Sequence, residues 1–418
     1  MCLTIPAKVI KTNADKAVIF RDGVKKIIDA RTVEGLKVGD WVLYISDIAI
    51  QKVSAKDAKE ILDLLEYTNK TDPEGLNPVF IEIIKNSKTR KLNKEEIEFL
   101  LKTNGREKEA LFSEADMIRR TYIKDFFCIH GIIEFSNYCK NDCFYCGLRK
   151  ENDKILRYRM GVGEIVRAAE KAFKKGYKLM VLQSGDDYFY TKEKLVEIIK
   201  KIKEKCRVFI FISIGERNFE TYKALREAGA DGVLFRFETS NESLFNKLHP
   251  KGKNFKNRFK TLKFLKELKY FIATGSIVGL PYQVISDLAV DIMILRDMNA
   301  DMISFGPFVP CPNTPFADKQ PGDIDLALKM MSILRLEMKN TKIPVVTALE
   351  TLDPKKGRKR AIKAGANALM FNITPKKYQP LYEIYKRRDA CDRKTWEKYG
   401  LYNTEESYKM LEEKLRVK

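Results

Sequence analysis

The chain has 418 residues and carries 78 Lys and Arg against 57 Asp and Glu, which gives a net charge of +21. This length accommodates one large domain and a smaller one. No apolar run approaches the ~20 residues of a membrane span, and the N-terminus has no signal-peptide pattern, so we expect no membrane association. Eight cysteines in so long a chain indicate a reducing cytoplasm and argue against a disulfide scaffold.

The positive charge raises the question of nucleic-acid binding, which needs Lys and Arg clustered on one face. Here the basic residues alternate with acidic ones along amphipathic segments, as in Lys194, Glu197, Lys201 and Glu204. That arrangement is typical of a solvated surface. The composition therefore disfavours nucleic acid as a partner.

Residues 1–67 are predicted to form a small module of their own. Short β-rich runs at 8–10, 17–21, 26–29 and 41–50 are separated by turn signals at 21–23 and 38–40, which predicts a small, OB-like β-barrel. A helical pattern follows over 56–67. Residues 68–109 are interpreted as a polar linker and a helical lead-in.

Beyond this lead-in, apolar strand-like runs alternate with amphipathic helical segments eight times, which predicts an α/β fold, a (β/α)8 barrel of the TIM type over residues 110–391. Residues 392–418 are assigned to a C-terminal helical extension. The eight predicted strands are 126–134, 179–183, 208–214, 232–237, 271–278, 302–308, 345–349 and 368–372.

Three cysteines follow the first of these strands in a CX3CX2C arrangement, Cys139, Cys143 and Cys146. Three thiolates on one loop can hold three corners of an iron-sulfur cluster and leave the fourth iron open for a small molecule. Structural zinc and free thiols are the alternatives. Zinc needs four ligands, and the two histidines, His130 and His249, do not have a paired spacing with a cysteine. Barrel enzymes place their chemistry at the carboxyl ends of the strands, where this loop lies.

The stretches 131–139 and 143–149 around these cysteines resemble the radical S-adenosylmethionine (radical SAM) superfamily and, within it, the HydE maturases of FeFe hydrogenase. The resemblance extends over roughly residues 110–391. It implies two cofactors, a 4Fe-4S cluster and S-adenosylmethionine, whose C5′–S bond is broken by one electron to give a 5′-deoxyadenosyl radical. It also implies an electron donor of the ferredoxin or flavodoxin type.

The same resemblance implies a set of cofactor-binding residues. Ser184, Gly185 and Asp186 match the motif whose backbone holds the methionine amine, and a glycine there lets the chain approach the ligand closely. Arg258 matches an arginine directed at the S-adenosylmethionine carboxylate, a task that suits a bidentate guanidinium. Tyr145, Ser213, Glu216, Arg236, Glu238 and Ile277 complete the set. An ordinary turn, surface ion pairs and a core aromatic are the alternative interpretations of these positions.

On the opposite side of the barrel the resemblance implies a substrate pocket with several departures from the family. Cys311 replaces a His, Val346 a Thr, Glu350 a Gly and His130 an Arg, and a changed polar pocket indicates a changed substrate. Cys391 alone remains of a second-cluster motif, so no second cluster is predicted, and Cys128 and Cys206 are assigned to the core. The candidate substrate residues are Cys311, Thr347, Thr351, Asn372, Tyr378 and Tyr382.

The N-terminal module resembles the HypC/HupF family of hydrogenase-maturation chaperones in its start at Met1-Cys2 and in the segments 38–43 and 49–50. The resemblance implies that Cys2 is a ligand of an iron complex, the alternative being a buried or terminal thiol. Ile45 and Asp47 stand where the family has a His and a Gly. Docking to a maturation protein is therefore an alternative to metal handling.

Together the two resemblances imply a radical SAM enzyme that tailors an iron-cyanide-carbonyl precursor or a related small molecule in hydrogenase-type maturation. Tethering makes transfer between the modules intramolecular. Two other enzyme classes stay open, a methylornithine-synthase-like amino-acid mutase and a biotin-synthase-like enzyme. A non-catalytic iron-complex scaffold is the alternative of another class.

Overall fold

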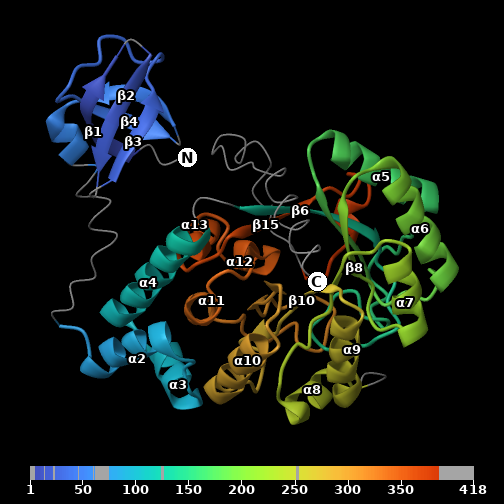
Figure 1. Ribbon diagram of the computed structural model, residues 1–418. Coiled ribbons are helices and arrows are strands. Elements are labelled where there is room, and N and C mark those ends of the chain that lie inside the picture. The colour runs from blue at the N-terminus through green and yellow to red at the C-terminus, as the bar shows by residue number, and fades with distance from the viewer. Residues whose placement is uncertain are drawn as a thin grey trace. The chain divides into compact units, whose positions relative to one another are not determined.

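The computed structural model describes residues 5–13, 15–21, 24–45, 47–59, 61, 75–123, 127–250 and 254–385. The chain divides into two compact units, and the division falls between Gly75 and Leu76 (Figure 1). In the described part of the chain, no helix combines the length and the apolar character needed to cross a bilayer.

The first unit is a closed barrel of five short strands, in the order β1-β2-β3-β5-β4. The strands are β1 (Ile5–Thr12), β2 (Lys16–Arg21), β3 (Val24–Asp29), β4 (Trp41–Ile45) and β5 (Ile48–Val53). Inward-facing Ala7, Val9, Ile19, Ile28 and Val42 fill its core, as alternation along half-buried strands requires. The predicted small β-barrel is confirmed.

One detail of the predicted first module differs from the structure, and its predicted helix is tested only in part. The run 41–50 is two antiparallel strands, with Ile45 paired to Ile48 across a turn, because apolar alternation continues on both sides of that turn. The predicted helix is present over residues 55–59 and at 61, and residues 62–67 lie outside the described residues.

Three helices precede the large barrel: α2 (Pro78–Thr89), α3 (Lys94–Lys102) and α4 (Gly105–Ile123). Their starts follow from capping, since Asn77 accepts a hydrogen bond from the Val79 N–H and Asn93 forms a capping box with Glu96. α3 packs on α10 and α4 on α11, so this helical lead-in covers one side of the second unit.

The described residues of the second unit form an eight-stranded parallel sheet in the order β12-β10-β9-β8-β7-β6-β15-β14. An isolated parallel bridge from Met302 to Lys342 joins the two edges, so the sheet is nearly closed and the predicted (β/α)8 barrel is confirmed. Its strands are β6 (Cys128–Ser136), β7 (Leu179–Ser184), β8 (Phe209–Ser213), β9 (Gly232–Leu234), β10 (Phe271–Thr274), β12 (Met302–Ile303), β14 (Pro344–Val345) and β15 (Ala368–Asn372).

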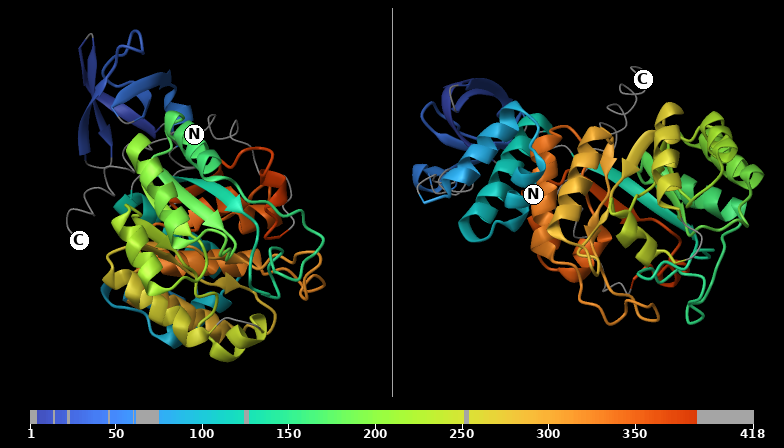
Figure 2. Two further views of the ribbon diagram at one scale, coloured as in Figure 1. Left: turned by 90° about the vertical axis from the view of Figure 1, so that its right-hand side faces the viewer. Right: turned by 90° about the horizontal axis from the view of Figure 1, so that it is seen from below.

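Helices surround this sheet, and long loops extend from one end of the unit in both views of Figure 2. A short 3-10 turn, η1 (Gln379–Leu381), follows the last strand. The helices are α5 (Val162–Lys174), α6 (Lys192–Lys205), α7 (Phe219–Glu227), α8 (Glu242–Leu248), α9 (Phe255–Glu267), α10 (Ile285–Asp297), α11 (Ile324–Glu337), α12 (Thr347–Leu352) and α13 (Gly357–Lys363).

The predicted strand over 345–349 is wrong beyond Val345, because helix α12 begins at Thr347. The predicted strands 271–278 and 302–308 are each interrupted, and their second parts pair with each other as β11 (Ile277–Val278) and β13 (Gly306–Pro307). At this point the backbones meet closely, since a Cβ on Gly275 would lie 2.1 Å from the Ser304 carbonyl oxygen. Periodicity does not reveal a strand that bends away from its sheet.

The barrel interior is apolar near the amino ends of the strands and polar near their carboxyl ends. Cys128, Val181, Phe211 and Ala273 belong to the buried inner cluster, and Gly232 leaves the space that the Phe211 ring fills. Nearer the carboxyl ends, the inner residues Ile132, Leu234 and Met370 are only partly buried. The barrel is therefore not filled at this level, next to the loops that follow the strands.

Candidate active site

The cysteine loop follows β6 and is fixed to two neighbouring loops. Cys143 is buried, whereas Cys139 and Cys146 are partly exposed. The Lys140 N–H donates to the Asp186 carbonyl at 3.0 Å, and the Phe144 N–H donates to the Leu248 carbonyl at 3.0 Å. These two hydrogen bonds fix the backbone of the cysteine loop at Lys140 and at Phe144.

Gly185 brings the loop after β7 directly against the cysteine loop. A Cβ at this position would lie 2.2 Å from the Tyr138 carbonyl oxygen and 2.9 Å from the Cys139 Cβ, so only glycine fits. The next N–H, that of Asp186, points at the Cys139 Sγ at 3.4 Å. The structure thus shows a close approach of this glycine to the cysteine loop, and its expected approach to a ligand stays a prediction.

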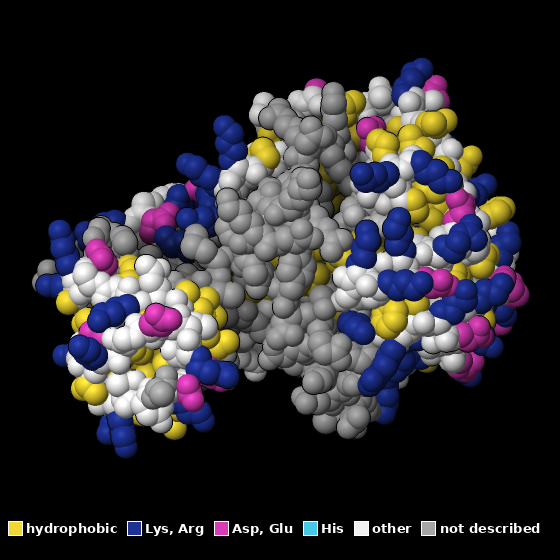
Figure 3. Space-filling model, turned by 90° about the horizontal axis from the view of Figure 1, so that it is seen from above, with side chains coloured by type: hydrophobic (Ala, Val, Ile, Leu, Met, Phe, Trp, Pro, Cys, Tyr) yellow, Lys and Arg dark blue, Asp and Glu magenta, His cyan; other side chains and the backbone are white. Residues whose placement is uncertain are grey.

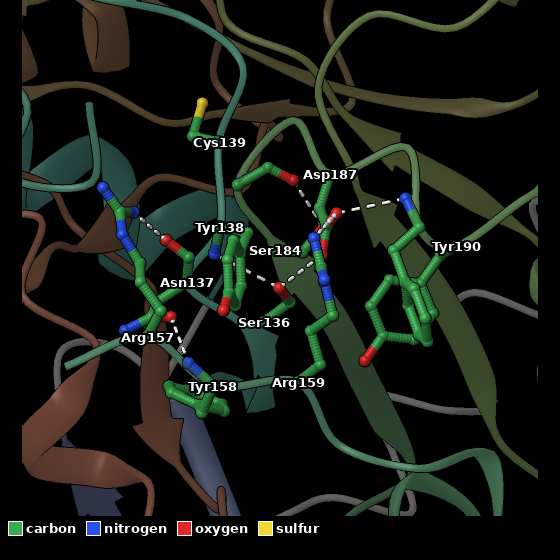
Figure 4. A network of polar contacts seen from close by, with 12 residues as sticks. Ser136, Asn137, Tyr138, Cys139, Arg157, Tyr158, Arg159, Ser184, Asp187 and Tyr190 are labelled. Atoms are coloured by element: carbon green, nitrogen blue, oxygen red, sulfur yellow. Dashed lines mark hydrogen bonds and ion pairs between the residues drawn. The ribbon is translucent and has the colours of Figure 1, made fainter. Parts of the chain in front are cut away.

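An ion pair between the exposed Arg159 and the buried Asp187 supports the same contact (Figure 4). Asp187 accepts hydrogen bonds from the Ser136 hydroxyl at 2.7 Å and from Arg159 at 2.8 and 3.0 Å. Burial acts to raise the pKa of this carboxyl, but the bonds from Arg159 and Ser136 outweigh it and the pKa is lowered. Asp187 is therefore a charged anchor between β6 and the loop after β7.

Arg157 holds the backbone on the other side of the cysteine loop. Its guanidinium donates to the carbonyls of Asn137, Leu148, Arg149 and Asn152. Burial lowers its pKa, and the nearby Cys139 and Cys146 act to raise it. One cation thus lies within electrostatic reach of two of the thiols, and a neighbouring cation favours their thiolate forms.

The three thiols of the cysteine loop are a donor set that a 4Fe-4S cluster can take from one loop. Within the described ranges, no group of three or more His, Cys, Asp or Glu side chains is placed to hold one metal ion. A 4Fe-4S cluster does not need such convergence, because each thiolate binds a different iron.

Arg258, on α9, places a buried cation beside the end of β8. Its Nε lies 3.2 Å from the Glu216 Oε1, without hydrogen-bond geometry, and its guanidinium packs 4.5 Å from the centre of the Phe235 ring. The buried Nη2 has no hydrogen-bond partner among the described residues. Buried donors are normally paired, so this nitrogen fits an anionic group of a ligand, such as a carboxylate.

Arg236, Glu238 and Ile277 come together at the end of β9. The Arg236 Nε lies 3.2 Å from the Glu238 Oε2, and the Arg236 Nη2 donates to the Ser276 carbonyl at 2.6 Å. Glu238 has a φ of +69°, a left-handed conformation that costs a non-glycine residue free energy and often marks a functional site. The Ile277 N–H donates to the Glu238 carbonyl at 2.9 Å, which fixes the next segment.

In the sequence, Tyr145 lies between the last two cysteines of the loop, and in space its ring contacts a cluster of buried apolar side chains. It packs with Phe144 against a buried cluster that includes Ile277 and Leu280. His249 accepts from the Tyr145 hydroxyl at 2.9 Å, because its other ring nitrogen donates to the Phe245 carbonyl at 2.8 Å. Burial and the charge of Glu238 raise the pKa of Tyr145, so its hydroxyl is neutral at pH 7.

A ring of polar side chains above the apolar interior was missed in part by the sequence reasoning. Glu134 is paired with Gln183 in the β6–β7 register, and Glu134 accepts from the Asn372 Nδ2 at 2.7 Å. Counting in steps of two from the inner residues of each strand would have found them. The inward positions at this level are Glu134, Gln183, Ser213, Arg236, Ser304 and Asn372.

Cys311 and Tyr382 both lie near the cysteine loop. A Cβ on Gly147 would be 2.6 Å from the Cys311 Sγ, and the Gly147 N–H donates to the Ile384 carbonyl at 2.7 Å. Tyr382 is buried, and burial followed by the charges of Glu134 and other neighbours raises its pKa. The segment after β15 therefore closes over the loop at Gly147.

The remaining candidate substrate residues are held by other contacts. The Thr351 hydroxyl donates to the Thr347 carbonyl at 2.9 Å within α12. Tyr378 donates to Glu164 at 3.1 Å and stacks on Tyr158, which places its hydroxyl at the start of α5. The structure does not bring Tyr378 to the two threonines.

The structure shows the surroundings of two residues that depart from the family pattern, His130 and Glu350. His130 is buried inside the barrel, 3.2 Å from the Cys128 sulfur, and burial lowers its pKa to about 4. Glu350 pairs with Arg358. Cys128 and Cys206 are buried, as predicted, whereas Cys2 and Cys391 lie outside the described residues.

Comparisons with known proteins show which families this chain is similar to. Residues 133–292 match the radical SAM superfamily, and residues 1–65 match the HupF/HypC family. The [FeFe] hydrogenase maturase subunit HydE of Thermotoga maritima is 44% identical over 73% of this chain and 87% of its own length. The 3-methylornithine synthase of Methanosarcina acetivorans is 31% identical over 68% of this chain and 80% of its own.

Solved structures show the same architecture. A crystal structure of methylornithine synthase has a TM-score of 0.69 and 25% identity, and it covers 80% of this chain and 99% of its own. The FeFe-hydrogenase maturase HydG from Carboxydothermus hydrogenoformans has a TM-score of 0.67 at 19% identity, with 82% and 81% covered, which supports the fold alone. With the cysteine loop, the nearly closed barrel and the extent of the HydE match, the chain belongs to the radical SAM superfamily and, within it, to the HydE family.

Proposed function

We propose that this protein is a radical SAM enzyme that reductively cleaves S-adenosylmethionine and acts in hydrogenase-type metallocofactor maturation. The observation that carries the proposal is the contact between the two loops, in which Gly185 and the Asp186 N–H meet Cys139. It ties the loop that holds the cluster to the loop that holds the methionine end in the family. The match to HydE supports the assignment to maturation.

When bound, the reduced 4Fe-4S cluster supplies the electron that breaks the C5′–S bond of S-adenosylmethionine and yields the 5′-deoxyadenosyl radical. Cys139, Cys143 and Cys146 would hold the cluster, and Arg157 would stabilise their charge. The Arg258 Nη2 would bind the methionine carboxylate, and Ser184 to Asp186 the amine. Arg236, Ser213, Glu216 and Glu238 would orient the ribose side, and Tyr145 and Ile277 the adenine.

The substrate pocket is proposed to lie inside the barrel at the level that is not filled, next to the loops that follow the strands. Glu134 on β6 and Arg236 after β9 occupy inward positions, so a bound molecule would meet a carboxylate and a guanidinium that is itself paired with Glu238. Cys311, Tyr382 and Asn372 would line its wall. A small thiol-bearing molecule or an iron-cyanide-carbonyl complex that carries an amino acid fits this distribution.

A second enzyme reading has a specific observation in its favour. The same pair of opposite charges suits a free amino acid, and 3-methylornithine synthases are among the relatives. Biotin-synthase-like chemistry and a non-catalytic iron-complex scaffold remain the weaker alternatives. Label transfer from candidate substrates into 5′-deoxyadenosine separates the enzyme readings.

The N-terminal module, proposed to span residues 1–67, is assigned to docking or to iron transfer through Cys2. Its match to the HupF/HypC family supports an interaction with a maturation protein. A cytoplasmic location is proposed for the whole chain, since its described cysteines are unbridged thiols and such a site needs reducing conditions.

Anaerobic reconstitution with iron and sulfide, followed by reductant and S-adenosylmethionine, tests the proposal. The wild type should form 5′-deoxyadenosine, Cys143→Ala should not, and Cys206→Ala should behave as the wild type because Cys206 caps the end of α6. No 5′-deoxyadenosine from a brown, iron-loaded wild type would reject the enzyme readings and leave the scaffold.

A further inference from the structure

The loop between β7 and α6 exposes two aromatic rings next to the cysteine loop. Tyr188 is 53% exposed and Phe189 is 47% exposed. Large exposed aromatics are unusual on a solvated surface and mark interaction sites when they are grouped. These two are adjacent in sequence and belong to the loop that contacts Cys139.

Cations cover both rings. The Lys140 Nζ lies 4.1 Å and the Arg217 Cζ 4.3 Å from the centre of the Tyr188 ring. The Lys194 Nζ lies 3.5 Å and the Arg159 Cζ 4.6 Å from the centre of the Phe189 ring. The docking patch is defined as Lys140, Arg159, Tyr188, Phe189 and Lys194, and Arg217 is buried beneath the Tyr188 ring.

Two buried carboxylates lie beneath this patch and balance part of its charge. Asp187 pairs with Arg159, and the Asp186 Oδ2 lies 4.0 Å from the Lys140 Nζ, so the solvent-facing side of the patch consists of cations and aromatic rings. The exposed Glu193 and Glu220 pair with Lys192, outside the patch. On the face in Figure 3, basic side chains are mixed with acidic and apolar ones.

The patch is also the part of the surface that is bonded to the cluster loop. Lys140 directly follows Cys139, and its Nζ donates to the Tyr188 hydroxyl at 2.8 Å. Two residues before Tyr188, the Asp186 N–H lies 3.4 Å from the Cys139 Sγ. A short path of covalent and hydrogen bonds therefore joins the exposed rings to the sulfur of Cys139.

We propose that this patch is the docking site of a small acidic ferredoxin that reduces the enzyme, an inference that rests on the proposed function. Opposite charges steer such a partner, and Tyr and Arg are favoured anchors at the centre of interfaces. Electron-transfer encounters bury less than about 1,200 Å², which suits a patch of this size. One electron leaves the reduced ferredoxin and enters the cluster, and no atom or proton is exchanged.

Binding is the first test, because it does not depend on turnover. The dissociation constant of oxidised acidic ferredoxin for the reconstituted protein is measured by calorimetry at low salt. Lys194→Glu and Phe189→Ala should each weaken binding at least about fivefold, and the Lys194 effect should shrink in high salt through screening. The matched control is Lys359→Glu, an exposed lysine on α13, which Figure 1 shows on a different side of the barrel from α6.

Turnover with two reductants then separates the two proposals. With dithionite, which needs no docking site, Lys194→Glu should form 5′-deoxyadenosine at the wild-type rate, and with limiting ferredoxin it should be slower. Lack of product from the wild type with dithionite contradicts the proposed function, whatever the binding data show. Binding by Lys194→Glu as tight as by Lys359→Glu overturns the docking site, even if cleavage is normal.

Discussion

Replacement of Gly185 by alanine tests the contact on which the proposed site depends. The added Cβ would lie 2.2 Å from the Tyr138 carbonyl oxygen and 2.9 Å from the Cys139 Cβ. Both are closer than any ordinary contact, so the two loops must separate by about 1 Å. Forcing an extra carbon into a packed site costs about 1–3 kcal/mol, and here backbone has to move.

We expect this free-energy penalty to destabilise the closed arrangement of the two loops and to leave the stability of the whole fold nearly unchanged. A penalty of 1–3 kcal/mol lowers the population of the closed arrangement roughly 5- to 150-fold. The Asp186 N–H contact to Cys139 would be lost with it. We therefore expect Gly185→Ala to bind iron more weakly and to lose S-adenosylmethionine cleavage, while its thermal unfolding stays close to that of the wild type.

Iron content and the visible absorption of the reconstituted protein measure this effect. The matched control is Gly161→Ala, where the added Cβ meets only the Glu164 Oε2 at 3.8 Å and no strain is expected. If Gly185→Ala retains iron and cleavage at the level of Gly161→Ala, the loops do not meet as described and the reasoning is refuted.

Three further predictions concern single side chains. Arg258→Gln should weaken S-adenosylmethionine binding about 10- to 100-fold, since a hydrogen bond to a charged group contributes about 1.5–3 kcal/mol; equilibrium dialysis measures it, and an unchanged affinity contradicts the role. Gly147→Ala should loosen the segment at Glu383 and Ile384, whose carbonyls the new Cβ would meet at 2.1 and 3.1 Å; hydrogen exchange there should rise, and unchanged protection argues against it. His130 should stay neutral down to its pKa of about 4. Because this lies below the value near 6.5 of the unfolded chain, up to ~3 kcal/mol of stability is present above pH 6.5 and is lost as the pH falls to 4. The chain has two histidines, so an NMR titration resolves both, and a His130 midpoint near 6.5 would refute the burial argument.

Much of the architecture could be predicted because it depends on local patterns. Strand runs such as 179–183 and 368–372 consist of apolar residues bounded by turns, and burial under helices requires that composition. The cysteine loop was found from spacing alone, since one loop supplies all three thiols. The strand ending at 349 was mispredicted because Thr347 to Leu352 is short and apolar enough to suit either structure.

The rest depends on contacts between distant segments, which periodicity does not encode. The role expected for Gly185 beside a ligand stays a prediction, and the structure adds its close contact with Tyr138, 47 positions earlier in the sequence, which no local pattern indicated. Tyr378 was assigned to the substrate pocket with Tyr382 from the family resemblance, and only the structure shows that its hydroxyl donates to Glu164. Glu134 was overlooked because its importance comes from the neighbours that the barrel gives it.

The central claim is that the three cysteines of one loop hold a cluster with one iron open to S-adenosylmethionine. Electron paramagnetic resonance of the anaerobically reconstituted, reduced protein tests it most directly, before and after addition of S-adenosylmethionine. The account predicts a 4Fe-4S signal that changes shape when S-adenosylmethionine binds the open iron, and loss of that signal in Cys143→Ala. A cluster signal that S-adenosylmethionine leaves unchanged would contradict the account.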